Sequence, residues 1–140
     1  MIEINGVAHV FLTVSDVNRS TPFYERLLGF CGLTTVMKAE GQIYYAVGGR
    51  TGVGIEQVDA AHRGDRFVQQ RVGLHHLCLR VRQREDVDRV YQELLAMGAT
   101  IVHPPEEGPW APGYYSVLFE DPDGIRLEVN HVPGKGLLAT

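Results

Sequence analysis

Hydrophobic and polar positions alternate along two stretches of the chain, VAHVFLTV at 7–14 and HHLCLRV at 75–81. Alternation with a period of two is typical of strands with one buried face, and the first stretch is also rich in β-branched residues. Successive side chains on a strand point to opposite faces, so His9 falls on the face opposite the apolar set. The same reasoning puts His76 on the polar face of the second strand and sends His75 toward the apolar, helix-facing side.

Each alternating stretch is followed by a predicted helix. The first runs through PFYERLL at 22–28, after Ser15 and Asp16 as N-cap candidates, and the second runs through EDVDRVYQELLAM at 85–97. Short β-rich pieces then follow in each half, at 34–39, 42–48 and 53–58 and again at 100–105, 114–121 and 125–132. The order of elements in each half is therefore β-α-β-β-β.

The two halves also match each other residue by residue. A shift of 67 residues places His9 on His76, and near the end of each half a shift of 72 places Glu56 on Glu128. Internal repeats of this kind indicate two copies of one structural module.

The predicted fold class is α+β, with two β-α-β-β-β modules. A chain of this length suggests one domain over residues 1–140, with modules at about 1–70 and 71–135. The tail GKGLLAT at 134–140 is expected to be an extension or an edge contact.

Four metal-competent side chains share the polar face by this alternation: His9, Glu56, His76 and Glu128. Two imidazoles and two carboxylates suit a divalent metal, and an octahedral ion would keep positions open for water or substrate. A single His or Glu on a strand is more often a solvated or locally hydrogen-bonded residue than a metal ligand. Their equivalent places in the repeat favour a catalytic metal site.

Composition and charge exclude several classes of partner. The formal net charge is −4 and no basic patch is visible, which argues against nucleic acid. No apolar run is long enough to span a bilayer, and no signal segment is visible at the N-terminus. With two cysteines and no paired metal or disulfide motif, a cytoplasmic protein is expected.

Four segments resemble the vicinal-oxygen-chelate superfamily, which includes glyoxalases, bleomycin-resistance proteins and extradiol dioxygenases: AHVFLTVSD, PFYERLLGF, GLHHLCLRV and FEDPDGIRLEV. The resemblance implies two modules in pseudo-twofold arrangement, with their strands curled around a metal-binding cavity. The metal positions of that family fall on His9, Glu56, His76 and Glu128. This set is most similar to glyoxalase I and methylmalonyl-CoA epimerase, and implies one divalent ion per site, Ni, Co, Zn, Mn or Fe.

The resemblance further implies a lyase or isomerase that moves a proton on a small substrate chelating the metal through adjacent oxygens. The catalytic base would be Glu128 or Glu56. Thr13 and Ala60 stand where glyoxalase I has an arginine and an asparagine for glutathione, so the use of glutathione or another thiol stays open.

Other family chemistries also remain open. An extradiol-type dioxygenase or a fosfomycin-resistance transferase would need only His9, His76 and Glu128, which leaves Glu56 surplus, and in a dioxygenase Glu56 would occupy a place that oxygen or catecholate needs. A bleomycin-resistance-like protein would bind a small molecule without turnover.

Substrate contacts are expected from Phe11, Arg80, Trp110 and Tyr115, with Tyr114 as the alternative to its neighbour. The partners expected are a small-molecule substrate and a second copy of the chain in a homodimer, as in small members of the family, with no nucleic acid and no membrane.

Overall fold

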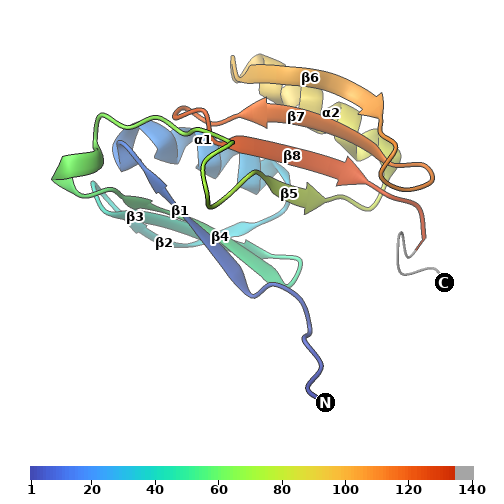
Figure 1. Cartoon of the computed structure of the whole chain (residues 1–140), viewed down its shortest axis with the longest axis horizontal. Coiled ribbons are helices and arrows are strands. Elements are labelled where there is room, and N and C mark those ends of the chain that lie inside the picture. The colour runs from blue at the N-terminus through green and yellow to red at the C-terminus, as the bar shows by residue number, and fades with distance from the viewer. Residues whose placement is uncertain (135–140) are drawn as a thin grey trace. The chain divides into compact units, whose positions relative to one another are not determined.

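The computed structural model describes residues 1–134, so the predicted tail lies outside the described residues from position 135 onward. The elements follow one another along the chain (Figure 1) as β1 (His9–Val14), α1 (Val17–Phe30), β2 (Thr34–Ala39), β3 (Ile43–Gly48), β4 (Thr51–Gln57), a 3-10 turn η1 (Ala60–His62), β5 (Leu77–Arg80), α2 (Arg84–Ala96), β6 (Thr100–Glu107), β7 (Tyr115–Glu120) and β8 (Arg126–His131).

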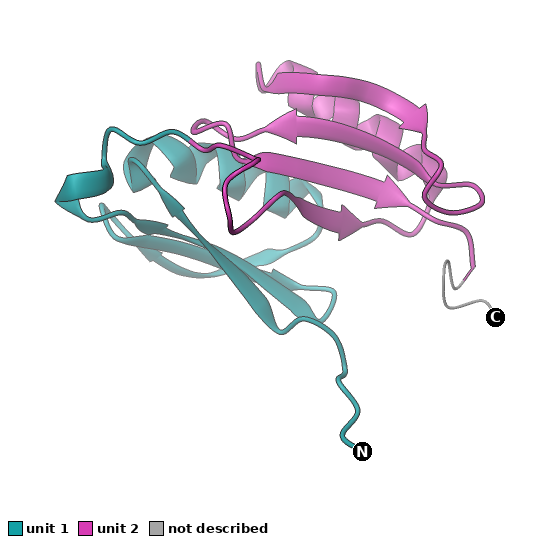
Figure 2. Cartoon of the chain, viewed as in Figure 1, with its two compact units in different colours: residues 1–66 teal, residues 67–140 magenta. Residues whose placement is uncertain are grey.

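Two compact units divide the chain, one over Met1–Arg66 and the other over Phe67–Thr140 (Figure 2). Each unit has the predicted β-α-β-β-β order and one four-stranded sheet, so the α+β fold class is confirmed. No helix among residues 1–134 is long and apolar enough to span a membrane.

In the first unit the strand order is β1-β4-β3-β2, with β1 parallel to β4 and the other pairs antiparallel. Helix α1 packs against β2, β3 and β4. Leu12 and Val14 of β1 are buried on the helix side, while His9 and Phe11 are exposed on the other face. The N-terminus of α1 is capped by Asp16, whose carboxylate accepts from two backbone N–H groups of the first turn.

The second unit repeats this arrangement with the order β5-β8-β7-β6, and α2 packs against β6, β7 and β8. The turn between β7 and β8 is fixed by Asp121, whose Oδ1 accepts from the backbone N–H groups of Asp123 and Ile125 at 2.8 Å each. Gly124 in this turn has a φ of 84°, a conformation that glycine adopts without strain. The turn sets the register in which Leu118 of β7 lies opposite Glu128 of β8.

Candidate functional site

The candidate site is a cavity of about 400 Å³ within the second unit. It lies on the face of the sheet away from α2. Its titratable and aromatic lining consists of His75, His76, His103, Trp110, Tyr114 and Glu128. This volume is in the range of small-molecule sites.

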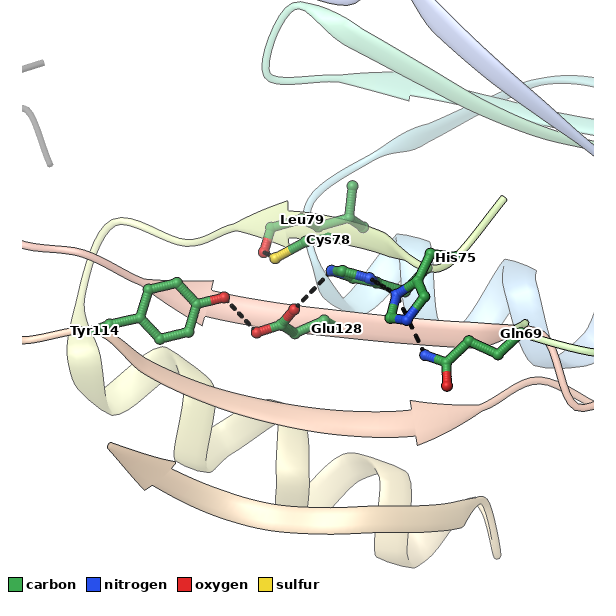
Figure 3. A network of polar contacts seen from close by, with 7 residues as sticks. Gln69, His75, Cys78, Leu79, Tyr114 and Glu128 are labelled. Atoms are coloured by element: carbon green, nitrogen blue, oxygen red, sulfur yellow. Dashed lines mark hydrogen bonds and ion pairs between the residues drawn. The ribbon is translucent and has the colours of Figure 1, made fainter. Parts of the chain in front are cut away.

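In the wall of the cavity the side chain of His76 lies next to that of Glu128. The Nε2 atom of His76 lies 3.2 Å from Oε2 of Glu128, and the side chain of Glu128 is only 9% exposed against 37% for His76. The other carboxylate oxygen, Oε1, accepts a hydrogen bond of 2.5 Å from the hydroxyl of Tyr114 (Figure 3). The carboxylate is thus held from both sides.

One row of residues across the sheet builds this face. Glu128 of β8 pairs with Cys78 of β5 on one side and with Leu118 of β7 on the other, and Leu118 pairs with His103 of β6. Residues directly opposite one another in a sheet point to the same face. The register therefore brings His103, Cys78 and Glu128, far apart in the sequence, to one surface.

Two neutral donors surround the carboxylate. Burial, then the charge of Glu128, raises the pKa of the Cys78 thiol to about 12. Burial and the hydrogen bond to Glu128 likewise raise the pKa of the Tyr114 hydroxyl. Tyr114 therefore remains a proton donor to Glu128 at neutral pH, and Cys78 remains a thiol.

The predicted placement of His75 is wrong. His75 lines the same cavity as His76, and the Nδ1 atoms of the two rings lie 2.8 Å apart. Both histidines precede β5, which begins at Leu77, in a bent segment where strict strand alternation does not hold. The two neighbouring rings therefore do not point to opposite faces.

In the first unit the strand register separates His9 from Glu56. His9 lies opposite Gly52 on the neighbouring strand, and Glu56 lies opposite Thr13. The two side chains are four positions apart along paired strands, which is about 13 Å at about 3.3 Å per residue. The register therefore does not bring the backbones of these two residues together, and a shared ion for them stays a prediction.

The sheet register identifies the true counterpart of Glu128. Phe11 pairs with Gly54 in the first unit, as Cys78 pairs with Glu128 in the second. Phe11 and Cys78 each lie two residues after the histidine of their strand. Gly54, and not Glu56, therefore holds the place of Glu128.

In the first unit aromatic rings cover Gly54, the position equivalent to Glu128. A side chain on Gly54 would collide with the ring of Phe11, and one on Gly52 would collide with the ring of Tyr45. Phe11 and Tyr45 stack with their centroids 5.1 Å apart, and the ring of His9 meets Phe11 edge-on at 5.6 Å. This face presents His9 beside an aromatic surface and no carboxylate at the equivalent position. A substrate contact by Phe11, which is 39% exposed, stays a prediction.

Two of the predicted substrate contacts point elsewhere. Arg80 donates to the backbone carbonyl of Val132 at 2.8 Å and is not part of the cavity wall. Tyr115 donates to Asp88 of α2 at 2.7 Å, and the guanidinium of Arg84 lies 3.6 Å from its ring centroid. Alternation along β7 puts Tyr115 on the helix side with buried Val117 and Phe119.

The remaining aromatic candidates lie at the cavity. Trp110 lines it and is 70% exposed, and Tyr114 takes the place expected of its neighbour. Sequence reasoning did not single out His103, which also lines the cavity. The Nδ1 atom of His103 donates to the carbonyl of Pro104 at 2.8 Å, which leaves Nε2 as an acceptor in the neutral ring. Counting residues outward from the β7–β8 turn places Leu118 opposite Glu128, but the irregular pairing of β6 with β7 conceals the position of His103.

The residues at the cavity fit part of a metal site. Among residues 1–134 no three His, Cys, Asp or Glu side chains converge as a complete set of ligands. His76 Nε2 and Glu128 Oε2, however, have the spacing of two ligands of one ion, because atoms about 2.0–2.2 Å from a common metal lie roughly 3 Å apart. An imidazole and a carboxylate are the donor types that first-row divalent metals accept.

The comparison with protein families agrees with this architecture. A sequence model of the Glyoxalase/Bleomycin resistance protein/Dioxygenase superfamily matches residues 6–129. The chain belongs to this superfamily. The resemblance seen in the sequence is therefore confirmed, although superfamily membership alone specifies neither the reaction nor the metal.

Individual relatives cover nearly the whole chain. A virulence protein of Salmonella typhimurium is 28% identical over 128 residues, which are 91% of this chain and 84% of that protein. The crystal structure of a putative glyoxalase from Bacillus halodurans is similar with a TM-score of 0.80 and 28% identity, covering 91% of this chain and 96% of the other. That of lactoylglutathione lyase from Agrobacterium tumefaciens has a TM-score of 0.68 and 25% identity, with 91% and 94% covered.

Proposed function

We propose that this protein is a metal-dependent enzyme of the glyoxalase type, a lyase or isomerase that moves a proton on a small substrate with two adjacent oxygens. The observation that carries the proposal is the contact of His76 with Glu128 in the cavity, with Tyr114 bound to the far carboxylate oxygen. A nearly buried carboxylate beside an imidazole, in a cavity of small-molecule size, favours catalysis over a structural role.

His76 and Glu128 would hold the metal in the second unit, and His9 stays a ligand predicted from the sequence. Glu56 is not included, because its register separates it from His9. A divalent ion bound there would act as a Lewis acid, stabilising negative charge that develops on the substrate oxygens.

The residues of the cavity supply the remaining functions. The carboxylate of Glu128 is the proposed base that takes a proton from the carbon next to a carbonyl and returns it to the neighbouring carbon. The hydrogen bond from Tyr114 restrains Glu128 while it does so. His103 offers Nε2 as a second acceptor, and Trp110 covers bound substrate at the cavity wall.

A second candidate is an extradiol-type dioxygenase. It is favoured by one observation, the glycine at position 54 in place of a second glutamate. Two histidines and one carboxylate are the ligand set of non-haem Fe(II) oxygenases, and the objection that Glu56 would occupy the oxygen site no longer holds.

The test begins with protein stripped by a chelator and reloaded separately with Zn, Ni, Co, Mn or Fe(II). Proton exchange on 2-oxoaldehyde–thiol adducts is followed by NMR in D₂O, and oxygen uptake is followed with catechols. Metal-dependent proton exchange, lost in Glu128→Gln and retained in Glu56→Gln, supports the glyoxalase-type reaction. Oxygen uptake with Fe(II) alone would favour the dioxygenase.

The proposal fails if ligands bind equally well before and after chelation and no metal supports turnover. That result would indicate a small-molecule binding protein of the bleomycin-resistance type. A homodimer is also proposed, and sedimentation velocity of the purified chain measures it.

A further inference from the structure

One polar side chain in the cavity wall, Ser116 of β7, makes no side-chain hydrogen bond within residues 1–134. Ser116 is only 4% exposed. Alternation along β7 places it with Leu118 on the cavity side, opposite the buried Val117 and Phe119. A buried hydroxyl without a partner costs free energy, so native structures rarely keep one unless a water or a ligand completes it.

The neighbouring strands do not supply a partner for this hydroxyl. Asn130 of β8 and Glu106 of β6 lie opposite Ser116 in the sheet. Asn130 hydrogen-bonds the hydroxyl of Tyr114, and Oε1 of Glu106 lies 3.6 Å from Nδ1 of His103. The hydroxyl of Ser116 is therefore available to a group that enters the cavity.

The strand register sets the distance between Ser116 and the proposed metal ligand Glu128. Glu128 lies opposite Leu118, and Ser116 is two residues before Leu118 on the same strand and face. Diagonal neighbours of this kind in a sheet are about 7–8 Å apart. The side chain of Leu118 also lines the cavity. This part of the wall therefore presents a carboxylate, an apolar side chain and a hydroxyl.

The charges around Ser116 favour a neutral ligand group. Among the described residues no lysine or arginine lines the cavity. The carboxylates of Glu106 and Glu128 belong to residues directly and diagonally opposite Ser116. A second anionic group of the substrate would lie near these carboxylates without a permanently positive partner, whereas a hydroxyl can donate to Ser116 or accept from it.

We propose that Ser116 is a specificity-determining residue that hydrogen-bonds a hydroxyl group of the substrate. The inference rests on the proposed function and narrows its substrate class. Such a substrate chelates the metal at His76 and Glu128 through two adjacent oxygens and carries a short apolar segment against Leu118. Its neutral hydroxyl lies about 7–8 Å from the chelating end. An analogue with a methyl group in that place would leave Ser116 buried and unpaired, which is how a hydrogen-bonding site rejects a substrate.

The test uses two chelating probes of equal length. Hydroxypentanohydroxamate has a hydroxyl on its last carbon, and hexanohydroxamate has a methyl group at the same place. Both bind a metal through two adjacent oxygens, so they differ only at the end expected near Ser116. Affinities are measured by isothermal titration into the Zn²⁺-loaded full chain, Ser116→Ala and Ser20→Ala. Ser20 is the matched control, a fully buried serine of α1 whose hydroxyl also has no partner among residues 1–134.

The ratio of the two affinities is the quantity that decides. We expect the unsubstituted protein to bind the hydroxyl probe about 10-fold more tightly than the methyl probe. In Ser116→Ala the ratio should fall to within a factor of about two, because the alanine offers no hydrogen bond. In Ser20→Ala the ratio should keep its original value. Circular dichroism and melting temperature check that all three proteins are folded.

A second readout needs no metal. The chain contains three serines, Ser15, Ser20 and Ser116, so labelling serine with ¹⁵N gives three backbone signals. The signal of Ser116 is assigned by its loss in Ser116→Ala. In chelator-stripped protein with millimolar probe, we expect the hydroxyl probe to shift this signal more than the methyl probe does. The signals of Ser15 and Ser20 should stay in place.

Other results overturn the inference. Equal affinities for the two probes in the unsubstituted protein would mean that water satisfies Ser116, or Oδ1 of Asn130, which is also buried without a partner among residues 1–134. An unchanged ratio in Ser116→Ala contradicts the inference as well, and an equal loss of both probes would show a packing role. If neither probe binds the Zn²⁺-loaded chain, the proposed function fails on its own account. The serine signals of the stripped protein then decide, since a shift selective for the hydroxyl probe supports the inference and its absence overturns it.

Discussion

The two units use the same strand register to build two different surfaces. Across the sheet of the first unit one row consists of Met37, Tyr45, Gly54 and Phe11. The corresponding row of the second unit consists of His103, Leu118, Glu128 and Cys78. The two sheets thus share one strand register, while this row carries two aromatic rings in the first unit and a histidine, a cysteine and a glutamate in the second.

This difference shows how a sequence repeat can mislead. Gly54 and Glu56 are two positions apart, so they point to the same face of β4. Alternation therefore cannot distinguish them, and the match of Glu56 to Glu128 was compatible with it although Gln57 interrupts the apolar set. Only the pairing of β1 with β4 shows that the match is displaced by two residues.

The largest effect on metal affinity is expected from His9, the ligand that the sequence predicts in the first unit. His9→Ala should lower Zn²⁺ affinity by roughly 100-fold or more, since losing a direct ligand exceeds the loss of an outer partner. Isothermal titration with Zn²⁺ measures it. Thr13→Ala, on the same face of β1, is the control and should leave affinity within a factor of about three. Unchanged binding in His9→Ala would mean that the metal is held by the second unit alone.

The next effect concerns the aromatic cover of Gly54. Gly54→Ala should destabilise the protein by about 1–3 kcal/mol, because the added methyl group meets the ring of Phe11. Urea unfolding measures the free energy. Gly64→Ala is the matched control, since nothing lies within 4 Å of a Cβ at that position. Equal stability of the two variants would refute the tight contact over Gly54.

A smaller effect is expected at the tyrosine that holds Glu128. Tyr114→Phe removes the hydroxyl that donates to Oε1 and keeps the ring. Zn²⁺ affinity should fall by about 10-fold, which is the lower end of the effect of removing a hydrogen-bond partner of a metal ligand. Tyr115→Phe removes a hydroxyl bound to Asp88 instead and should leave affinity unchanged. A reversed order of the two variants would contradict the assignment of Tyr114 to the cavity.

The smallest effect compares the two helices. Helix α1 has a side-chain cap from Asp16, whereas Gln83 at the start of α2 makes no such hydrogen bond. Asp16→Ala should therefore cost about 1 kcal/mol of unfolding free energy, and Gln83→Ala should cost close to nothing. Thermal and urea unfolding of both variants measure the difference, and neither should change metal binding.

Much of the fold follows from local patterns in the sequence. Alternation identified β1, and the N-cap candidates Ser15 and Asp16 placed a helix directly after it, because these signals depend on neighbours along the chain. The position of His75 did not follow, since β5 begins only at Leu77 and the bend before it obeys no period. Tyr115 and Arg80 were misplaced because their partners, Asp88 and Val132, come from elements whose register the sequence does not specify.

The candidate site could be predicted from the sequence only in part, again because the sequence does not specify the pairing of distant strands. Glu128 was found because the last strand carries a clear alternation, and His76 was found by its repeat match to His9; the structure brings the two within 3.2 Å. His103 was missed because β6 pairs with β7 through two irregularities that shift its register.

The most direct test of whether Glu128, and not Glu56, binds the metal is to measure the metal content of three proteins. These are the unsubstituted chain, Glu128→Gln and Glu56→Gln. Each is purified without an affinity-metal step, stripped, reloaded with Zn²⁺, desalted and analysed by plasma mass spectrometry. We expect about one metal per chain in the unsubstituted protein and in Glu56→Gln, and a clear loss in Glu128→Gln. Loss of metal in Glu56→Gln, or retention in Glu128→Gln, would contradict a site built on Glu128 without Glu56.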